Sequence, residues 1–294
     1  MAKGIYSGNI GISIFAEEEL IHQLKIEDIP PCHISDYRFE ENIKNYEWEL
    51  SIGLGSSILN VDLNKKIATA STLDLNLWDV VKLSNILFER TLQERGYYGV
   101  HSSAFEINGK GVLVIGDTMT GKSTIVLEAL SKYGANLIGA EDTIVSSDLE
   151  LVGGTKLIAP NPTSFFYFHK SLESCIKRFH KSGRPIIDAI SLGVKNSSIV
   201  HLDMIVYPKI TFNDILEGVE LNNNTKKNIL IRFLGSEIVG LEAIDKMRLP
   251  LPNLDNIDLR YKRFEVVSKI SDNTPFYFFG GNPSRILESI ISKL

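Results

Sequence analysis

The sequence predicts an α/β protein in which a small β-rich unit, residues 1-75, precedes a larger domain, residues 76-294, with a mixed sheet and flanking helices. Two observations support this division. The first seventy or so residues hold short alternating apolar runs, which are typical of half-buried strands. From about residue 75 the apolar residues recur at helical spacing, and strand-like and helix-like segments then alternate along the chain.

In the N-terminal unit, apolar and polar side chains alternate over residues 10–15, 46–52 and 58–63. These three runs predict a small antiparallel β unit. No group of residues in this unit has the pattern of a catalytic site.

The larger domain begins with a helix predicted over 77–95, which Gly96 ends. Two extended runs, 101–107 and 111–115, then flank Asn108-Gly109, which is the strongest short-range signal for a hairpin. A helix over 124–133, a buried strand over 136–140 and a second hairpin turning at Asp148 are expected next. The later predicted elements are helices over 163–180, 226–234 and 283–294 and strands over 200–207 and 276–279.

Composition excludes several classes of protein. The chain has 294 residues, of which 44% are hydrophobic and 23% charged, and no stretch reaches the ~18 apolar residues of a membrane span. The net charge of −5 argues against an extended nucleic-acid surface. No secretory leader is expected at the start. The two cysteines, Cys32 and Cys175, are interpreted as free thiols of a cytoplasmic protein, and no Cys/His cluster suggests zinc.

A glycine-rich loop after the second hairpin strand is the strongest functional signal. It matches G-x-x-x-x-G-K-[ST] in full. The glycines let backbone N–H groups wrap phosphates, and the start of the next helix adds partial positive charge. The lysine would reach the β- and γ-phosphates, and the serine hydroxyl would ligate Mg²⁺. The loop and the residue after it are Gly116, Asp117, Thr118, Met119, Thr120, Gly121, Lys122, Ser123 and Thr124.

Two further features lie where phosphoryl transfer would need them. Glu141-Asp142 follows a predicted core strand, and P-loop proteins place an acid there, near the metal and the γ-phosphate. A capping or turn-forming acidic pair is the alternative interpretation. His101 opens the first hairpin strand, and a turn at Asn108-Gly109 puts it opposite about Gly116. A histidine that only caps the strand is the alternative there.

The stretch from His101 to Asp142 resembles the catalytic core of the bacterial HPr kinase/phosphorylase family and its kinase relatives. In that family a histidine opens a strand. After it come a tight turn, a G-D-S-x-x-G-K-S loop, a helix, an apolar strand and an acidic pair. Here the loop begins Gly116-Asp-Thr, and the acidic pair is Glu141-Asp142. The resemblance covers about one-seventh of the chain, and the first seventy residues match nothing in the family.

The resemblance implies an HPr kinase-like P-loop fold and a role for each matching residue. Lys122 and the loop amides would bind the phosphates of ATP, and Ser123 would hold Mg²⁺. Glu141 stands where the first acid acts as general base, and Asp142 stands where the second acid supports the metal. His101 stands where a histidine lies close to the transferred phosphate. The glycine- and arginine-rich signature for recognition of HPr is missing, apart from the fragment Gly183-Arg184-Pro185, so HPr itself is not the expected acceptor.

The sequence therefore predicts an ATP- and Mg²⁺-dependent kinase that transfers the γ-phosphoryl group to a hydroxyl. The acceptor could be a serine of a peptide or protein, or a small-molecule alcohol. Two alternatives stay open. One is a nucleotide-binding regulatory or assembly module without an acceptor, and the other is an enzyme like phosphoenolpyruvate carboxykinase, for which the chain is short. The chain has no N-K-x-D tetrad of the GTPase type, so nothing argues for guanine selectivity. No membrane partner is expected, and a homo-oligomer is possible.

Overall fold

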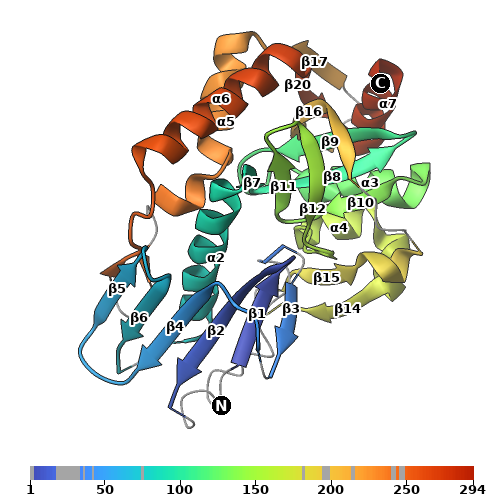
Figure 1. Ribbon diagram of the computed structural model, residues 1–294. Coiled ribbons are helices and arrows are strands. Elements are labelled where there is room, and N and C mark those ends of the chain that lie inside the picture. Colours follow the sequence, from blue (N-terminus) through green and yellow to red (C-terminus); the bar gives the residue numbers. More distant parts are fainter. Residues whose placement is uncertain are drawn as a thin grey trace.

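The computed structural model describes residues 3–17, 34–35, 37–41, 43–73, 76–180, 183–193, 199–212, 216–239, 243–244 and 249–294. These residues form a mixed α/β structure with two main sheets. Figure 1 shows the N-terminal sheet at the bottom, the larger sheet with its helices above it, and the helix α2 (Leu77–Glu94) between them. The predicted class of α/β with mixed sheets is therefore confirmed, and the structure is richer in strands than expected.

The N-terminal sheet has six strands in the order β3-β1-β2-β4-β6-β5. The prediction of an antiparallel unit is wrong for two pairings, because β2 with β4 and β4 with β6 are parallel. Parallel neighbours need a long connection, and residues 17–47 supply one between β2 and β4. The strands are β1 (Lys3–Ser7), β2 (Ile10–Ala16), β3 (Tyr37–Glu40), β4 (Trp48–Gly53), β5 (Ile58–Asp62) and β6 (Ile67–Ser71).

Helix α2 closes the apolar face of this sheet. It begins with a capping box, in which the Asn76 side chain and the Asp79 side chain each accept the other's backbone N–H. Its buried face packs in one cluster with the isoleucines of β1 and β2 and with Trp48. The Trp48 indole N–H also donates to the Thr91 hydroxyl at 2.8 Å. The helix thus joins the N-terminal sheet to the strands that follow it.

The larger sheet has nine strands, along the path β10-β8-β9-β16-β12-β11-β7, with β20 beside β16 and β17 beside β20. Strands β9, β16 and β20 run parallel to one another, and the other pairings are antiparallel. The strands are β7 (Tyr97–Val100), β8 (Ser102–Ile107), β9 (Lys110–Ile115), β10 (Asn136–Gly139), β11 (Thr143–Ser146), β12 (Glu150–Gly154), β16 (Val200–Ile210), β17 (Leu216–Glu220) and β20 (Phe276–Gly281).

The predicted hairpin before the glycine-rich loop is confirmed. Strands β8 and β9 pair antiparallel from Ser102 opposite Ile115 to Ile107 opposite Lys110. Asn108 and Gly109 have φ of 54° and 77°, as a two-residue turn of type I′ requires. Because β8 ends its pairing at Ser102, the preceding residue lies at the level of Gly116.

Helices cover both faces of the larger sheet, because neighbouring residues of each strand point to opposite sides. Val112 and Val114 pack with α3 (Lys122–Tyr133) and α7 (Pro283–Lys293). Leu113 and Ile115 pack on the other side with α5 (Asn223–Phe233) and α6 (Ile257–Asn273). The smaller elements are β13 (Leu157–Ile158), α4 (Pro162–Phe168), β14 (Ile176–Phe179), β15 (Pro185–Asp188), β18 (Ala243–Ile244), β19 (Leu249–Pro250) and the 3₁₀ turns η2 (Lys170–Cys175), η3 (Ala189–Leu192) and η4 (Ser236–Val239).

One helix prediction fails, and one helix was not predicted. The helix expected over 163–180 ends at Phe168, and its last residues form strand β14, because they pair with β15. Helix α6 was not predicted, because its buried apolar residues are sparse and leave the second turn polar.

Cys175 is a free thiol, and Cys32 lies outside the described residues. No helix within the described ranges has both the length and the apolar character that crossing a membrane requires.

Candidate functional site

The loop from Gly116 to Ser123 leaves β9 and enters α3 in a shape that only glycine allows at two positions. Gly116 has a φ of 151° and Gly121 a φ of 110°. A Cβ on Gly116 would lie 2.6 Å from the Thr120 hydroxyl, and one on Gly121 would lie 2.0 Å from Cγ1 of Ile210. The Ile210 amide donates to the Thr120 carbonyl at 3.1 Å. The end of β16 therefore packs against the loop and holds it in place.

Lys122 is the first residue of α3, and its side chain turns back into the loop. The ammonium donates to the Gly116 carbonyl at 2.7 Å and to the Asp117 carbonyl at 3.4 Å. The residue is 7% exposed. Burial lowers the pKa of the Lys122 ammonium, while the nearby charges of Glu141 and Asp117 act in the opposite direction. A loop that surrounds a buried cation is the arrangement in which a polyphosphate would be held.

Glu141 lies against the first turn of α3. The Ser123 hydroxyl donates to its Oε1 at 3.2 Å, and the Ala159 amide donates to the same oxygen at 3.2 Å. Burial raises the pKa of the Glu141 carboxyl, and the Ala159 hydrogen bond, Lys122 and Ser123 reduce that rise. A raised pKa brings a carboxylate closer to the range in which it can accept a proton from an alcohol. The structure thus brings together three predicted site residues, Lys122, Ser123 and Glu141.

Asp142 points the other way, toward the N-terminal unit. The Ser35 hydroxyl donates to its Oδ2 at 3.0 Å. Burial raises the pKa of Asp142 well above its ordinary value, and the carboxylate of Glu89 raises it further. Asp142 was predicted to support the metal beside Ser123, but the hydroxyl of Ser123 meets Glu141 instead. A contribution from the first seventy residues to this site was not predicted.

The backbone around the acidic pair is fixed by Thr155, which the sequence did not single out. The amides of Glu141 and Asp142 both donate to its hydroxyl, at 2.9 and 3.2 Å. Gly139 and Gly154 allow the two chain segments to approach, since a Cβ on either would lie within 2.6 Å of the Asp142 carbonyl oxygen. A strand followed by two glycines and a threonine, Gly153-Gly154-Thr155, is the one local sign of this contact in the sequence.

Asp117 of the loop is held by side chains from two distant elements. The Tyr207 hydroxyl donates to one of its carboxylate oxygens at 2.8 Å, and the Arg232 guanidinium forms an ion pair with the other at 3.0 Å. Thr118 and Met119 form the exposed tip, Met119 with a φ of 72°. Thr124 is buried in α3. The loop is therefore fixed at both ends, with its tip open to solvent.

Arg184 is a cation near the site that the sequence suggested only as part of a family fragment. It lies in the turn between β14 and β15, and its charge lowers the pKa of both Lys122 and Glu141. Within the part of the chain that the structure describes, its guanidinium forms no hydrogen bond or ion pair. A guanidinium in this position can bind a phosphate oxygen.

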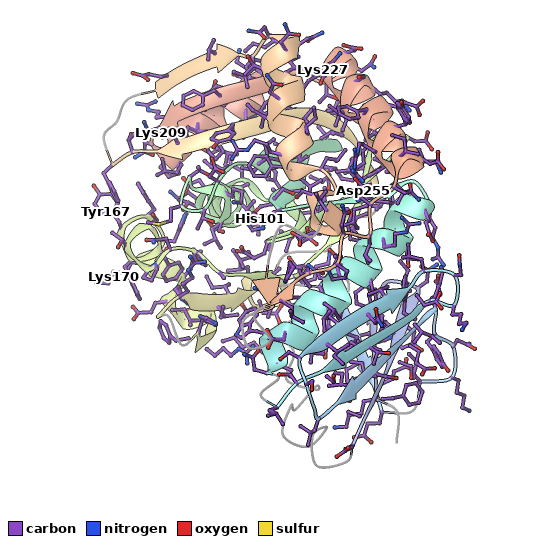
Figure 2. All side chains as sticks on the ribbon, turned by 90° about the vertical axis from the view of Figure 1, so that its left-hand side faces the viewer. His101, Tyr167, Lys170, Lys209, Lys227 and Asp255 are labelled. Atoms are coloured by element: carbon purple, nitrogen blue, oxygen red, sulfur yellow. The ribbon has the colours of Figure 1, made fainter. Side chains whose placement is uncertain are left out.

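A cavity of about 550 Å³ opens beside the loop and the acidic pair. His101 lines it together with Asp117, Thr118, Glu141 and Asp142. In Figure 2, His101 lies in the middle of the molecule, between α2 and the larger sheet. The predicted placement of His101 at the level of Gly116 agrees with the observed register. The remaining walls come from the N-terminal unit, from α2 and from the segment around η4, and include Ser7, Ser35, Trp78, Lys82, Asn85, Glu89, Arg232, Ser236 and Glu237.

The residues present fit a nucleotide with Mg²⁺. The loop offers amides and Lys122 to the phosphates, and the Ser123 hydroxyl and Glu141 offer oxygen atoms to the metal, which needs only one or two protein ligands in such sites. No three His, Cys, Asp or Glu side chains among the described residues converge as a complete metal site. The donor set therefore suits a metal that is bound largely by phosphate and water.

Comparison with known proteins adds little to this geometry. No protein-family model matches the chain. Among curated proteins, myosin-D of Toxoplasma gondii is 25% identical over 199 residues. The aligned region covers 64% of this chain and 23% of that protein, so this chain spans less than a quarter of the relative's length. A similarity of this identity and extent assigns no family.

Proposed function

We propose that this protein is an ATP- and Mg²⁺-dependent kinase, built on an HPr kinase-like P-loop core, which transfers the γ-phosphoryl group to an acceptor hydroxyl. The observation that carries the proposal is the placement of Glu141. Its carboxylate contacts Ser123 at the start of α3, lies within the electrostatic reach of Lys122, and lines the cavity beside the loop. A loop that only binds nucleotide has no need of a buried base that faces an open cavity.

The cations of the site would bind the phosphates. The loop amides and Lys122 would hold the β- and γ-phosphates, and Arg184 would contact the γ-phosphate, where negative charge spreads in the transition state. Asp117 does not oppose this binding, because Arg232 neutralises its carboxylate. His101 and Thr118 both line the cavity, where His101 could contact the transferred group.

Glu141 would act as the general base. As the acceptor oxygen forms its bond to the γ-phosphorus, Glu141 takes the hydroxyl proton, the bond between the γ-phosphorus and the β,γ-bridging oxygen breaks, and ADP leaves. Bound Mg²⁺ would neutralise phosphate charge, held by Ser123 and by the carboxylate of Glu141. Binding of a cation would favour the ionised form of this carboxylate, whose pKa burial now raises.

One observation favours a second candidate, a nucleotide-dependent regulatory or assembly module. The Ser35 hydroxyl binds Asp142, so the N-terminal unit is in direct contact with the acidic pair. A change at Asp142 on nucleotide binding could therefore move the N-terminal sheet. The two candidates differ in whether phosphate leaves ATP for an acceptor.

An acceptor screen followed by the Glu141→Gln variant separates them. The protein would be incubated with γ-labelled ATP and Mg²⁺ against pools of amino acids, sugars, nucleosides and serine-containing peptides. In Glu141→Gln we expect kcat to fall by roughly 10²–10⁴, with ATP affinity close to that of the wild type, because the shape stays and the base is lost. Glu265→Gln, an exposed change on α6, is the matched control. Loss of ATP binding with normal kcat would make Glu141 a structural or metal residue, and binding without any transfer would favour the regulatory module.

A cytoplasmic location stays a prediction.

A further inference from the structure

We propose that the cavity beside the loop binds the phosphoryl acceptor, and that this acceptor is a small alcohol that also carries a protonated amine. Its hydroxyl would face Glu141, and its ammonium would face Glu89 and Glu237. This inference rests on the proposed kinase activity, because only a kinase has a phosphoryl acceptor. The charge selectivity of the cavity can be tested separately, by measuring binding.

The size and walls of the cavity favour a small molecule. Its volume of about 550 Å³ lies within the range of small-ligand sites. The walls come from several parts of the chain that are distant in sequence, among them the N-terminal unit, α2, the glycine-rich loop, the acidic pair and the segment around η4. Helix α2 supplies both apolar and polar side chains to the wall. The apolar ones are Trp78, Val81, Phe88 and Leu92, and the polar ones are Lys82, Asn85 and Glu89. A site enclosed in this way surrounds a compact ligand.

Carboxyl groups outnumber cationic side chains on the walls of the cavity. Four carboxylates line the cavity besides that of Asp117, and the cations are Lys82 and Arg232. Arg232 is already paired with Asp117 at 3.0 Å. An acceptor with a phosphate or carboxylate group would be repelled here, whereas a cation would be attracted. The four carboxylates belong to Glu89, Glu141, Asp142 and Glu237.

Glu89 carries this argument because its carboxyl group is buried on the wall of the cavity. The residue is 4% exposed, and its carboxylate accepts hydrogen bonds from the Gly99 amide at 3.0 Å and the Gln93 side chain at 2.6 Å. In the described part of the molecule it has no ion-pair partner. Burial, with a smaller contribution from Glu237, raises the pKa of Glu89 to about 7, while Gln93, the Gly99 amide and the charge of Arg263 act in the opposite direction. An ammonium in the cavity would supply the missing countercharge.

An organic cation fits these acids better than a second metal ion does. Glu89 lies on α2, Glu237 on η4 and Asp142 after β10, and no three acidic side chains among the described residues converge closely enough to hold a metal. Acids spread over the walls of a cavity suit a ligand with its charge at one end and its hydroxyl at the other. Trp78 on the same wall could contact the ammonium through its ring face.

The test uses pairs of compounds that differ only by an ammonium in place of a hydroxyl. These are 2-amino-1,3-propanediol with glycerol, and glucosamine with glucose. Binding to the full chain would be measured by titration calorimetry at pH 7.5, with Mg²⁺ and a non-hydrolysable ATP analogue present. We expect the amine of at least one pair to bind about 10-fold or more tightly than its neutral partner, the size of one charge-assisted hydrogen bond.

Variants assign the preference to the acids. Glu237→Gln removes an exposed carboxylate at the cavity wall and should reduce the preference for the amine by about 10-fold, with affinity for the ATP analogue unchanged. Glu265→Gln should leave the preference intact. Three outcomes would overturn the inference. The neutral compounds could bind equally or more tightly, or none of the four compounds could bind. The third is a preference for the amine that survives both Glu237→Gln and Glu89→Gln. Amine-selective binding with no transfer from γ-labelled ATP would instead reject the proposed kinase activity.

Discussion

The buried carboxylate of Glu89 makes the stability of this protein depend on pH in a direction opposite to that of a salt-bridged acid. Its pKa is about 7 in the folded protein, against an ordinary value of 4.5. The folded state therefore holds this proton over a pH range in which the unfolded chain has released it. Stability from this group is fully present below pH 4.5 and is lost as the pH rises through 7.

The size of the effect follows from the two pKa values. They differ by about 2.5, and each pKa unit corresponds to ~1.36 kcal/mol, so Glu89 alone should lower the free energy of unfolding by about 3 kcal/mol between pH 4.5 and 7.5. The groups that act on it are Gln93, the Gly99 amide, Glu237 and Arg263. Burial also raises the pKa of Glu141 and Asp142, so both change the stability in the same direction.

The assay is urea unfolding of wild type and Glu89→Gln at several pH values from 4.5 to 8. Near pH 4.5 the two should be similar in stability, because glutamine resembles the protonated acid. At pH 8 the variant should be more stable by about 3 kcal/mol, since it has no charge to bury. Glu265→Gln should follow the wild type at every pH. Parallel curves for wild type and Glu89→Gln would refute the reasoning, because they would show that Glu89 is ionised normally in the folded protein.

Three further predictions concern the loop and its neighbour. Lys122→Ala should abolish phosphoryl transfer and weaken ATP binding, measured by calorimetry and with labelled ATP, and full activity would reject the nucleotide site. Gly121→Ala should lower the free energy of unfolding by about 1–3 kcal/mol and impair ATP binding, because the added Cβ meets Ile210 and the residue has a φ of 110°. The control is Gly134→Ala, where φ is 66° and the added Cβ meets no atom. It should lower the free energy of unfolding by about 1 kcal/mol and keep ATP binding. His101→Ala should lower kcat with little change in melting temperature, because the residue is exposed; a large fall in melting temperature with normal activity per folded molecule would make it structural.

The local parts of the site could be predicted from sequence because their signals are contained in a few consecutive residues. The turn at Asn108-Gly109 sets the register of β8 and β9, and that register places His101 at the level of Gly116. The spacing of Gly116, Gly121 and Lys122 defines the loop. The apolar strand before Glu141 places the acidic pair at the end of a core strand. Each of these inferences depends on backbone preferences or on a short repeat of apolar residues.

The prediction of secondary structure failed where strand pairing or tertiary packing outweighed the local sequence pattern. Residues after Phe168 have a helix-like composition, but β14 pairs with β15 and takes them out of the helix. The buried apolar residues of α6 are sparse and leave its second turn without one, and the helix is stabilised by its packing against the sheet together with α5. The N-terminal runs were recognised as strands, but no short-range signal shows that β2 and β4 are parallel.

The sequence by itself determined the loop, the hairpin and the acidic pair, and so the kind of chemistry that the site could perform. The tertiary structure alone decided what surrounds them. Ser35 reaches Asp142 across 107 positions of the chain, and Arg232 reaches Asp117 across 115. Such contacts depend on how the two sheets and α2 close around a common cavity, which is set by the burial of whole faces rather than by any local motif. For this reason the side chains that line the cavity could be identified only once the fold was known.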